Sequence, residues 1–239
     1  MPQKRAAIIV AGGSGTRMGA EIPKQFLPIA GTPILILTAK RFLEFDSEMP
    51  IVLVLPTSSF EYWNEVSREF LSEEDAMRIV VAAGGTTRTE SVHNGLETLM
   101  GHIPSTEDYA VGIHDGVRPF ISVEHLAGVF GRVEEQAGAV VCVPSKASLR
   151  KMDSDGSSVS VDRKDYWEVQ TPQVFPMTYL LEAYTNVPDD KLFTDDASLY
   201  EAFGYQVNIY EGSYENIKIT TPEDIFVAEG ILRRQTAKS

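Results

Sequence analysis

Residues 11–28 constrain this chain more than any other stretch, because a short apolar run opens there directly into a cluster of glycines. Residues 6–10, Ala-Ala-Ile-Ile-Val, have the length and composition of a buried strand. Three glycines and two cations follow, namely Gly12, Gly13, Gly15, Arg17 and Lys24. Glycine lets the backbone approach an anion closely, so that successive amides can point at phosphate oxygens. This order predicts a phosphate-binding loop at the end of a buried strand.

Two better-known phosphate loops do not match this segment. A P-loop requires Gly-x4-Gly-Lys-Ser/Thr, and no Lys directly follows any of these glycines. The dinucleotide fingerprint requires Gly-x-Gly-x-x-Gly, and Met18 stands where the third glycine belongs. What remains, Gly-x-Gly-Thr-Arg-Met followed by Pro-Lys, resembles the loop of nucleotidyltransferases that join a nucleoside triphosphate to a phosphorylated sugar or polyol. The alternative is a plain glycine-rich turn with two exposed basic residues.

The composition limits the class of protein and its partners. A chain of 239 residues suits one α/β domain with an embellishment, or at most two small domains. The net charge of −13 argues against general nucleic-acid binding, which needs basic surface to neutralise phosphates. The single cysteine, Cys142, lies in an apolar run and predicts a buried thiol. No stretch has the pattern of a signal peptide or a membrane span, which predicts a cytoplasmic protein without a membrane partner.

Strand and helix signals alternate along most of the chain. The predicted strands are residues 6–10, 51–55, 78–83, 109–114, 139–143 and 205–210. The predicted helices are residues 33–45 with Thr32 as cap, 58–71, 87–99, 122–136, 176–186, 195–203 and a closing helix from 221. This alternation predicts a Rossmann-like, mostly parallel α/β sheet with helices on both faces. The loops after the first, third and fourth strands then meet at the carboxyl edge, where ligands of such sheets bind.

The alternation is interrupted between residues 144 and 171. Residues 148–152 and 159–161 have the pattern of two short strands joined by the turn Asp-Ser-Asp-Gly. A hairpin of this size has little core of its own and needs something to pack against. It either folds back on its own domain or embraces a second subunit. We therefore expect a single domain over residues 1–239, with a protruding β-hairpin arm at about 144–171.

Six further motifs sharpen the resemblance. They are Gly-Gly-x-x-Arg-x-x-Ser-Val at 84–92, His-Asp-Gly-Val-Arg-Pro at 114–119, Asp-Arg at 162–163, Gln-Thr-Pro-Gln-x-Phe at 170–175, Thr-Asp-Asp-Ala-Ser at 194–198 and Asn-Ile-Lys-Ile-Thr-Thr-Pro-Glu-Asp at 216–224. In order and spacing they resemble the 2-C-methyl-D-erythritol 4-phosphate cytidylyltransferases of the non-mevalonate isoprenoid pathway. The resemblance implies a nucleotide-diphospho-sugar transferase-like fold, a homodimer formed through the arm, and Mg²⁺ as cofactor. It also implies a reaction in which CTP and the alditol phosphate give 4-diphosphocytidyl-2-C-methyl-D-erythritol and pyrophosphate.

The resemblance implies a role for each matching position. The catalytic groups would be Arg17, Lys24, Arg163 and Lys218. The nucleotide would contact Ala11, Gly12, Gly13, Gly15, Gly84, Gly85, Ser91, Asp115 and Gly116. The alditol phosphate would contact Arg118, Ser148, Thr171 and Thr194, and Asp115 would also hold the metal ion. Arg163 and Ser148 lie on the arm and would act across the dimer.

Several positions depart from the family pattern or have a simpler interpretation. Thr86 stands where the family often has Asp, so a base contact from that side chain is not implied. Ser148 replaces a common Thr and keeps the hydroxyl. We expect Arg88 to be an ion-pairing helix residue and His114 to be structural. Lys218, without its surrounding motif, would be interpreted as a solvated strand lysine.

Two other functions compete with this one. Ribitol 5-phosphate cytidylyltransferases resemble the chain in the glycine loop and in Thr-Pro-Gln, although Asp162, Arg163 and Trp167 fit the methylerythritol enzymes better. A non-catalytic nucleotide-binding regulator with the same fold is the alternative from another class. The presence of both loop cations together with Asp115 and Lys218 speaks against a regulator.

Overall fold

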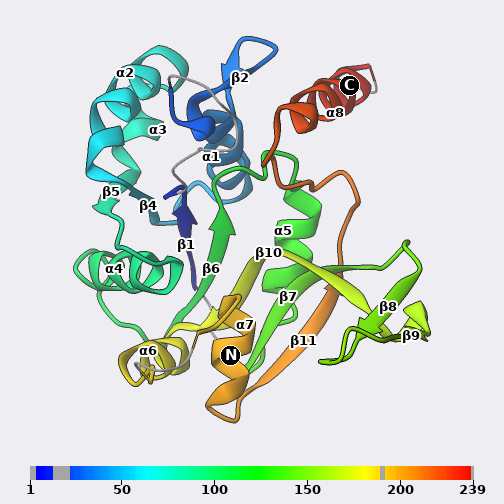
Figure 1. The fold of residues 1–239 in the computed structure, drawn as a ribbon. Helices are drawn as coiled ribbons and strands as arrows, with labels where there is room; N and C mark the ends of the chain where they lie inside the picture. Colours follow the sequence, from blue (N-terminus) through cyan, green and yellow to red (C-terminus); the bar gives the residue numbers. More distant parts are fainter. Residues whose placement is uncertain (1–3, 13–21, 189–191, 238–239) are drawn as a thin grey trace.

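Seven strands form the central sheet of the computed structural model, which describes residues 4–12, 22–188 and 192–237 (Figure 1). The strands are β1 (Lys4–Val10), β4 (Ile51–Leu55), β5 (Ile79–Ala83), β6 (Tyr109–Asp115), β7 (Ala137–Pro144), β10 (Trp167–Pro176) and β11 (Gln206–Glu211). Their order in the sheet is β11-β7-β10-β6-β1-β4-β5. All neighbouring pairs are parallel except the two that involve β10. The prediction of a mostly parallel α/β sheet is confirmed.

Helices cover both faces of this sheet (Figure 1). They are α1 (Ile34–Phe45), α2 (Phe60–Phe70), α3 (Glu73–Met77), α4 (Arg88–Met100), α5 (Val123–Phe130), α6 (Met177–Thr185), α7 (Asp196–Ala202) and α8 (Pro222–Thr236). Short 3-10 helices lie at η2 (Lys24–Phe26), η3 (Thr57–Ser59) and η4 (Arg163–Asp165). Among the described residues, none of these helices is long and apolar enough to cross a membrane.

Alternate residues of β1 enter two separate cores. Ala7 and Ile9 pack in the cluster that includes residues of α1, α2 and α5, whereas Ala6 and Ile8 pack with residues of α4, α6 and α7. A strand covered on both faces is apolar at successive positions, which is why residues 6–9 form a continuous apolar run. Trp63 and Cys142 are buried in these cores, as predicted.

A third cluster connects the end of the chain to the carboxyl edge of the sheet. It joins Ala228 and Ile231 of α8 to Ile219, Val117 and Ile34, all of them buried. The amide of Ile219 also donates to the carbonyl of Val117 at 3.0 Å. The segment before α8 therefore runs beside the loop that follows β6.

Strand β10 is the main departure from the predicted topology. It lies antiparallel between β6 and β7, so residues 173–176 pair with β6 and residues 167–174 pair with β7. For these residues the sequence predicts the end of the arm, up to about residue 171, and no strand of the central sheet. The protruding part is consequently shorter than residues 144–171, because Gln170 and Thr171 are already buried within the sheet.

The arm itself is a two-stranded hairpin of β8 (Leu149–Met152) and β9 (Ser158–Val161). It extends away from the sheet beside β7 and β10 (Figure 1). The amide of Ser145 donates to the carbonyl of Tyr166 at 3.0 Å and closes its base. The hairpin strands pair only with each other, so the arm is a separate two-stranded sheet.

Two predicted helix boundaries are wrong. The helix capped by Ser122 ends at Phe130 and not near Gln136, and the amide of Gly131 closes its last turn on the carbonyl of Ala127 at 3.0 Å. Helix α1 begins at Ile34, because Thr32 and Pro33 form the short strand β3 paired with β2 (Pro28–Ile29). After Phe130 the chain continues in tighter turns, in which the amides of Arg132 and Val133 donate to the carbonyls three residues earlier, and before Ile34 strand pairing replaces the expected cap.

Candidate active site

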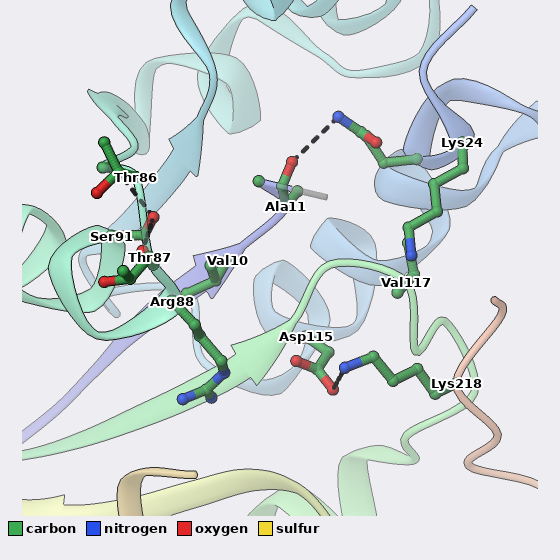
Figure 2. Close-up of a pocket in the computed structure, with 13 residues that line it drawn as sticks. Val10, Ala11, Lys24, Thr86, Thr87, Arg88, Ser91, Asp115, Val117 and Lys218 are labelled. Atoms are coloured by element: carbon green, nitrogen blue, oxygen red, sulfur yellow. Dashed lines mark hydrogen bonds and ion pairs between the residues drawn. The ribbon is translucent and has the colours of Figure 1, made fainter. Parts of the chain in front are cut away.

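A cavity of about 270 Å³ opens at the carboxyl edge of β1, β5 and β6, as the topology predicts (Figure 2). Its walls are Val10, Ala11, Gly12, Lys24, Gln25, Gly85, Thr86, Thr87, Arg88, Ser91, Asp115, Val117 and Lys218. Residues predicted for the phosphate loop, the Gly-Gly motif, the His-Asp-Gly motif and the Asn-Ile-Lys motif therefore meet at one place. We call this cavity the pocket.

Asp115 is the negative charge of the pocket. It ends β6 and is buried, and its Oδ2 contacts Nε of Arg118 at 3.1 Å and Nζ of Lys218 at 3.0 Å. Burial alone would raise the pKa of this carboxyl group, but Lys218 and then Arg118 outweigh it and hold the pKa well below its usual range. Asp115 is therefore an ionised carboxylate at neutral pH.

A buried hydrogen-bond chain behind Asp115 fixes its backbone. Thr171 Oγ1 accepts from the amide of Asp115 at 3.0 Å and lies 3.0 Å from Nδ1 of His114. Nε2 of His114 lies 3.0 Å from the carbonyl of Arg118, which can only accept, so Nε2 carries the proton and Nδ1 accepts from the threonine hydroxyl. Burial lowers the pKa of His114 to about 4, so the ring is neutral. The expectation that His114 is structural agrees with this geometry.

Thr171 consequently has a different position from the one its predicted role requires. It is buried and its hydroxyl already makes both bonds of the chain, although we expect it to contact the alditol phosphate. In the structure it connects β10 to β6 directly behind the pocket. A substrate contact from Thr171 stays a prediction.

Lys218 is held beside Asp115 by the segment that precedes it. Nη1 of Arg118 donates to the carbonyl of Asn216 at 2.9 Å, and the side-chain Nδ2 of Asn216 donates to the carbonyl of Thr171 at 2.9 Å. Lys218 lies in the irregular segment before α8 and not in a strand, and although its side chain is 42% exposed, its ammonium group pairs with Asp115. Its ammonium group is directed at Asp115, whereas Lys24 approaches the pocket from η2 (Figure 2).

The end of β1 is braced from two sides. Nε2 of Gln25 donates to the carbonyl of Ala11 at 3.0 Å, which connects η2 and therefore Lys24 to this strand end. The amide of Gly116 donates to the carbonyl of Val10 at 2.8 Å, and a Cβ at position 116 would lie 2.7 Å from that of Ala11. Glycine is therefore required at 116 for β1 and the β6 loop to approach each other. Gly13, Gly15 and Arg17 lie outside the described residues.

The loop between β5 and α4 forms the opposite wall. Thr87 caps α4 by accepting from the amide of Glu90 at 3.0 Å, so the helix begins where predicted. The hydroxyl of Ser91 accepts from the amide of Gly85 at 3.0 Å and donates to the carbonyl of Thr87 at 2.8 Å. Ser91 thus shapes this loop, and its predicted contact with the base is not tested.

Arg88 forms the ion pair predicted for it. Its two terminal nitrogens donate to Asp196 at 2.8 and 2.6 Å, and the hydroxyl of Tyr184 donates to the same carboxylate at 2.5 Å. Burial lowers the pKa of Arg88, but Asp196 reverses this and raises it above its usual value. Asp196 belongs to the Thr-Asp-Asp-Ala-Ser motif, so this motif anchors α4 to α7 across the edge of the pocket.

Besides Arg118 and Thr171, which lie behind or beside Asp115 and do not line the pocket, three predicted substrate-binding or catalytic residues lie away from it. Arg163 and Ser148 are exposed on the arm, and Thr194 is exposed before α7. None of them is among the residues that line the pocket. Gly84 lines a neighbouring cavity of about 620 Å³ that shares Gly12, Gln25, Gly85 and Thr86 with the pocket.

Sequence reasoning missed three residues that organise the site, namely Gln25, Glu90 and Asp196. Gln25 directly follows Lys24 and is buried, so the Pro-Lys-Gln turn is packed against the domain and not exposed. Asp196 could have been found by pairing the Thr-Asp-Asp-Ala-Ser motif with Arg88, the cation of the Gly-Gly motif. Glu90 shows its role only in three dimensions, because its partners are the backbone and hydroxyl of Thr86.

Comparisons with known proteins agree on one family. Residues 5–234 match the family model of 2-C-methyl-D-erythritol 4-phosphate cytidylyltransferase, IspD. The chain is 44% identical to a protein of that name from Phocaeicola vulgatus, over 95% of this chain and 99% of the relative. It is 40% identical to another from Syntrophus aciditrophicus, with full coverage of both chains. The crystal structure of 4-diphosphocytidyl-2C-methyl-D-erythritol synthase from Anaerococcus prevotii superposes with a TM-score of 0.81 at 28% identity, covering 96% of each chain.

Proposed function

The chain belongs to the 2-C-methyl-D-erythritol 4-phosphate cytidylyltransferase family, and we propose that the pocket at the carboxyl edge of β1, β5 and β6 is its active site. The protein is a CTP-dependent enzyme that condenses CTP with 2-C-methyl-D-erythritol 4-phosphate, giving 4-diphosphocytidyl-2-C-methyl-D-erythritol and pyrophosphate. One observation carries the assignment of the site. The buried carboxylate of Asp115 lies 3.0 Å from Lys218 in a pocket that Lys24 also lines.

The chemistry of the reaction explains why such a pocket is needed. An oxygen of the alditol phosphate attacks the α-phosphorus of CTP, and a new P–O bond forms there. The bond from the α-phosphorus to the oxygen that leads to the β-phosphate breaks, and pyrophosphate leaves with the electron pair. A phosphate monoester is already largely anionic at neutral pH, since its second pKa is about 6, so no strong base is required. The difficulty is to bring two polyanions together.

Lys24 and Lys218 address that difficulty. Preorganised cations stabilise the charge that develops on the transferred phosphoryl group and on the leaving group. We assign Lys24, together with Arg17, to the triphosphate, and Lys218 to the phosphate oxygens near the line of attack. The backbone of Ala11, Gly12 and the glycine loop would cradle the nucleotide.

The donor set of the pocket fits a Mg²⁺ ion that is shared with the substrate. The closest contacts of Arg118 and Lys218 are both with Oδ2 of Asp115, and no hydrogen bond to Oδ1 is found among the described residues. The described part of the chain holds no group of three or more side chains that could ligate a metal ion. Mg²⁺ is commonly bound by one or two carboxylates plus substrate phosphates, which is what Asp115 can offer. When bound, the ion would neutralise charge on the phosphate oxygens.

We assign the arm to a homodimer in which each subunit completes the site of the other. Arg163 and Ser148 are exposed on an arm whose two strands pair only with each other. Apolar side chains are also exposed on the arm and at the start of β10, namely Met152, Val159, Tyr166, Trp167 and Val169. A two-fold interface over this surface would bury them and bring each arm to the partner's alditol phosphate.

Pyrophosphate release from CTP tests both the reaction and the choice of acceptor. We expect release with 2-C-methyl-D-erythritol 4-phosphate to exceed release with ribitol 5-phosphate by at least about 100-fold in kcat/KM, since specific polar contacts reject analogues that leave them unpaired. Preference for ribitol 5-phosphate would establish the alternative cytidylyltransferase. The absence of release with either acceptor, in the presence of Mg²⁺, would refute the assignment of function.

A further inference from the structure

Glu90 presents one engaged and one unengaged carboxylate oxygen at the base of the β5–α4 loop. Its Oε2 accepts from both the amide and the hydroxyl of Thr86, each at 2.6 Å. Its Oε1 makes no hydrogen bond or ion pair with the described residues. The bonds from Thr86 lower the pKa of Glu90, so the group is ionised at neutral pH. Two bonds to one oxygen fix the plane of the carboxylate and leave the other oxygen available.

The glycine before Thr86 makes room for this carboxylate. A Cβ at position 85 would lie 2.2 Å from Cγ of Glu90, so only glycine allows the Glu90 side chain to fold over the loop. In that position Glu90 lines the neighbouring cavity, which shares Gly12, Gly85 and Thr86 with the pocket. The carboxylate therefore lies in the cavity next to the pocket, whose lining does not include Asp115 or Lys218.

Helix capping accounts for only part of this geometry. In a capping box the third helical residue accepts from the amide of the cap, which is Thr87 here, and that amide is the smallest of the contributions that lower the pKa of Glu90. The two short hydrogen bonds of Glu90 come from Thr86, one residue earlier, through both its amide and its hydroxyl. The hydroxyls of Ser91 and Thr87 in this loop are already engaged, Ser91 with Gly85 and Thr87, and Thr87 with the amide of Glu90. Oε1 of Glu90 is thus a side-chain acceptor of this loop to which the described residues donate no hydrogen bond.

The charge of Glu90 indicates which part of the nucleotide it meets. A carboxylate repels the triphosphate, so its partner must be a hydrogen-bond donor at the uncharged end of CTP. Cytosine carries a 4-amino group, which donates, whereas uracil has an oxygen acceptor at that position, and carboxylates are known acceptors for the cytosine amino group. We propose that Oε1 of Glu90 accepts a hydrogen bond from the 4-amino group of cytosine and thereby discriminates CTP from UTP.

This inference rests on the proposed active site, and it explains how base selection survives Thr86 in place of the common Asp. The threonine hydroxyl cannot supply a negative acceptor, but it donates to Glu90 and holds that acceptor in place. Uracil would bring its oxygen against Oε1, and neither group could donate. A polar site that leaves such groups unpaired rejects the wrong substrate strongly.

The variant Glu90→Gln tests the proposal with a defined change. Thr86 donates twice to Oε2, so the amide oxygen must occupy that place and the NH₂ group must replace Oε1. The substitution therefore converts the free acceptor into a donor that suits uracil. We expect the ratio of kcat/KM for CTP over UTP to fall about 10- to 100-fold, the usual contribution of a hydrogen bond to a charged group. The readout is pyrophosphate release with 2-C-methyl-D-erythritol 4-phosphate.

Glu97→Gln is the matched control, because Glu97 lies on α4 two turns later and is exposed. It should leave the CTP to UTP ratio unchanged, and an equal change in both variants would overturn the proposal. Thr86→Val should lower the ratio less than Glu90→Gln does, since the backbone amide of residue 86 still holds Oε2. An unchanged ratio in a folded Glu90→Gln protein would also overturn it.

The wild-type enzyme provides a test that does not depend on any variant. A CTP analogue with hydrogen in place of the 4-amino group should react with kcat/KM reduced at least about 10-fold. Equal use of CTP and this analogue would refute the role of Glu90. If wild-type protein released no pyrophosphate from CTP itself, the proposed function would fail first, so the two failures are distinguishable.

Discussion

Two regions of the molecule use the same kinds of side chain in opposite ways. One is the pocket edge, by which we mean Asp115 with the residues that hold it (His114, Arg118 and Thr171), and the other is the arm. Arg118 at the pocket edge is 12% exposed, and it binds the carboxylate of Asp115 at 3.1 Å and the carbonyl of Asn216 at 2.9 Å. Arg163 on the arm is exposed, and among the described residues its one hydrogen bond goes to the carbonyl of Lys146 at 2.7 Å. Thr171 and Ser148 differ in the same way, since Thr171 is buried between two partners and Ser148 is exposed.

This difference separates two parts of the site. A single chain orients the polar side chains of the pocket edge by itself, whereas it does not orient those of the arm. At the pocket edge Asp115, Thr171 and Arg118 are oriented before a ligand arrives, because they contact one another at the end of β6 and in β10. Preorganisation of that kind is where electrostatic catalysis comes from. On the arm, orientation must be supplied by a binding partner or by the substrate, and both are ways to test the comparison.

The largest expected effect comes from removing a pocket cation. Lys24→Ala should lower kcat about 100- to 1000-fold, because it removes a charge that stabilises the transferred phosphoryl group. The midpoint of thermal unfolding should shift by less than about 2 °C, since partly exposed charges add little to stability. A pyrophosphate assay and a thermal melt measure the two quantities, with the exposed Lys40→Ala as control. Near-normal turnover in a folded Lys24→Ala protein would contradict its catalytic role.

Subunit mixing sharpens the comparison most directly. Arg163→Ala should lower kcat/KM about 10- to 100-fold, because charge-assisted hydrogen bonds to phosphate are lost. If the arm acts across the dimer, a mixed dimer of Arg163→Ala and Lys24→Ala subunits has one doubly damaged site and one intact site. With random exchange, about half of the dimers are mixed and activity should recover to about a quarter of wild type.

An arm that serves its own subunit gives a different result. Every site would then keep one lesion, and mixing would restore nothing. Exchange must be verified with differently tagged subunits, so that a failure to recover has only this meaning. Wild-type protein carried through the same exchange supplies the reference activity.

Because His114 at the pocket edge is buried and neutral, we expect the free energy of unfolding to depend on pH through this residue. Burial lowers its pKa to about 4 from an ordinary value of about 6.5, so the unfolded chain binds a proton first as the pH falls. Stability from this group is complete above pH 6.5 and is lost as the pH falls toward 4, by up to about 3 kcal/mol. Urea unfolding between pH 7 and 4.5 measures it. His114→Gln should flatten this slope and the exposed His102→Gln should not; equal slopes in both would contradict the assignment.

The smallest effect compares one hydroxyl in each region. Thr171→Val should lower the free energy of unfolding by about 1–3 kcal/mol, because the amide of Asp115 and Nδ1 of His114 both lose a buried partner. Ser148→Ala, on the exposed arm, should change it by less than about 0.5 kcal/mol. Urea unfolding of both variants at pH 7 gives the difference. Equal losses would mean that the arm is packed as firmly as the sheet.

The sequence indicates which segments line the pocket because their motifs are local. A strand that opens into glycines, and cations at fixed offsets, can be recognised without knowing the partners. The same holds for the cap at Thr87, where the helix begins as expected. Family resemblance then brought Lys218 to Asp115, which spacing alone could not do.

The features that were missed depend on pairing between distant segments. Strand β10 contains Pro172 and Pro176 and changes register between Val169 and Gln173, so its local pattern favours a loop. Its place between β6 and β7 is decided by the edges available in the folded sheet. Arg88 finds Asp196 for the same reason, since the two lie on separate helices that meet only after the sheet has formed.

The route by which Lys218 reaches the pocket has a consequence for how the enzyme is made. Synthesis releases β1, β4, β5 and β6 first, and these four strands are neighbours in the sheet. The segment that carries Lys218 emerges near the end, and with it the contact between Ile219 and Val117. A nascent chain on the ribosome therefore holds Asp115 without the ammonium group that later pairs with it. The pocket therefore acquires the ammonium group of Lys218 only after residue 218 has been translated, later than Lys24 and the four strands.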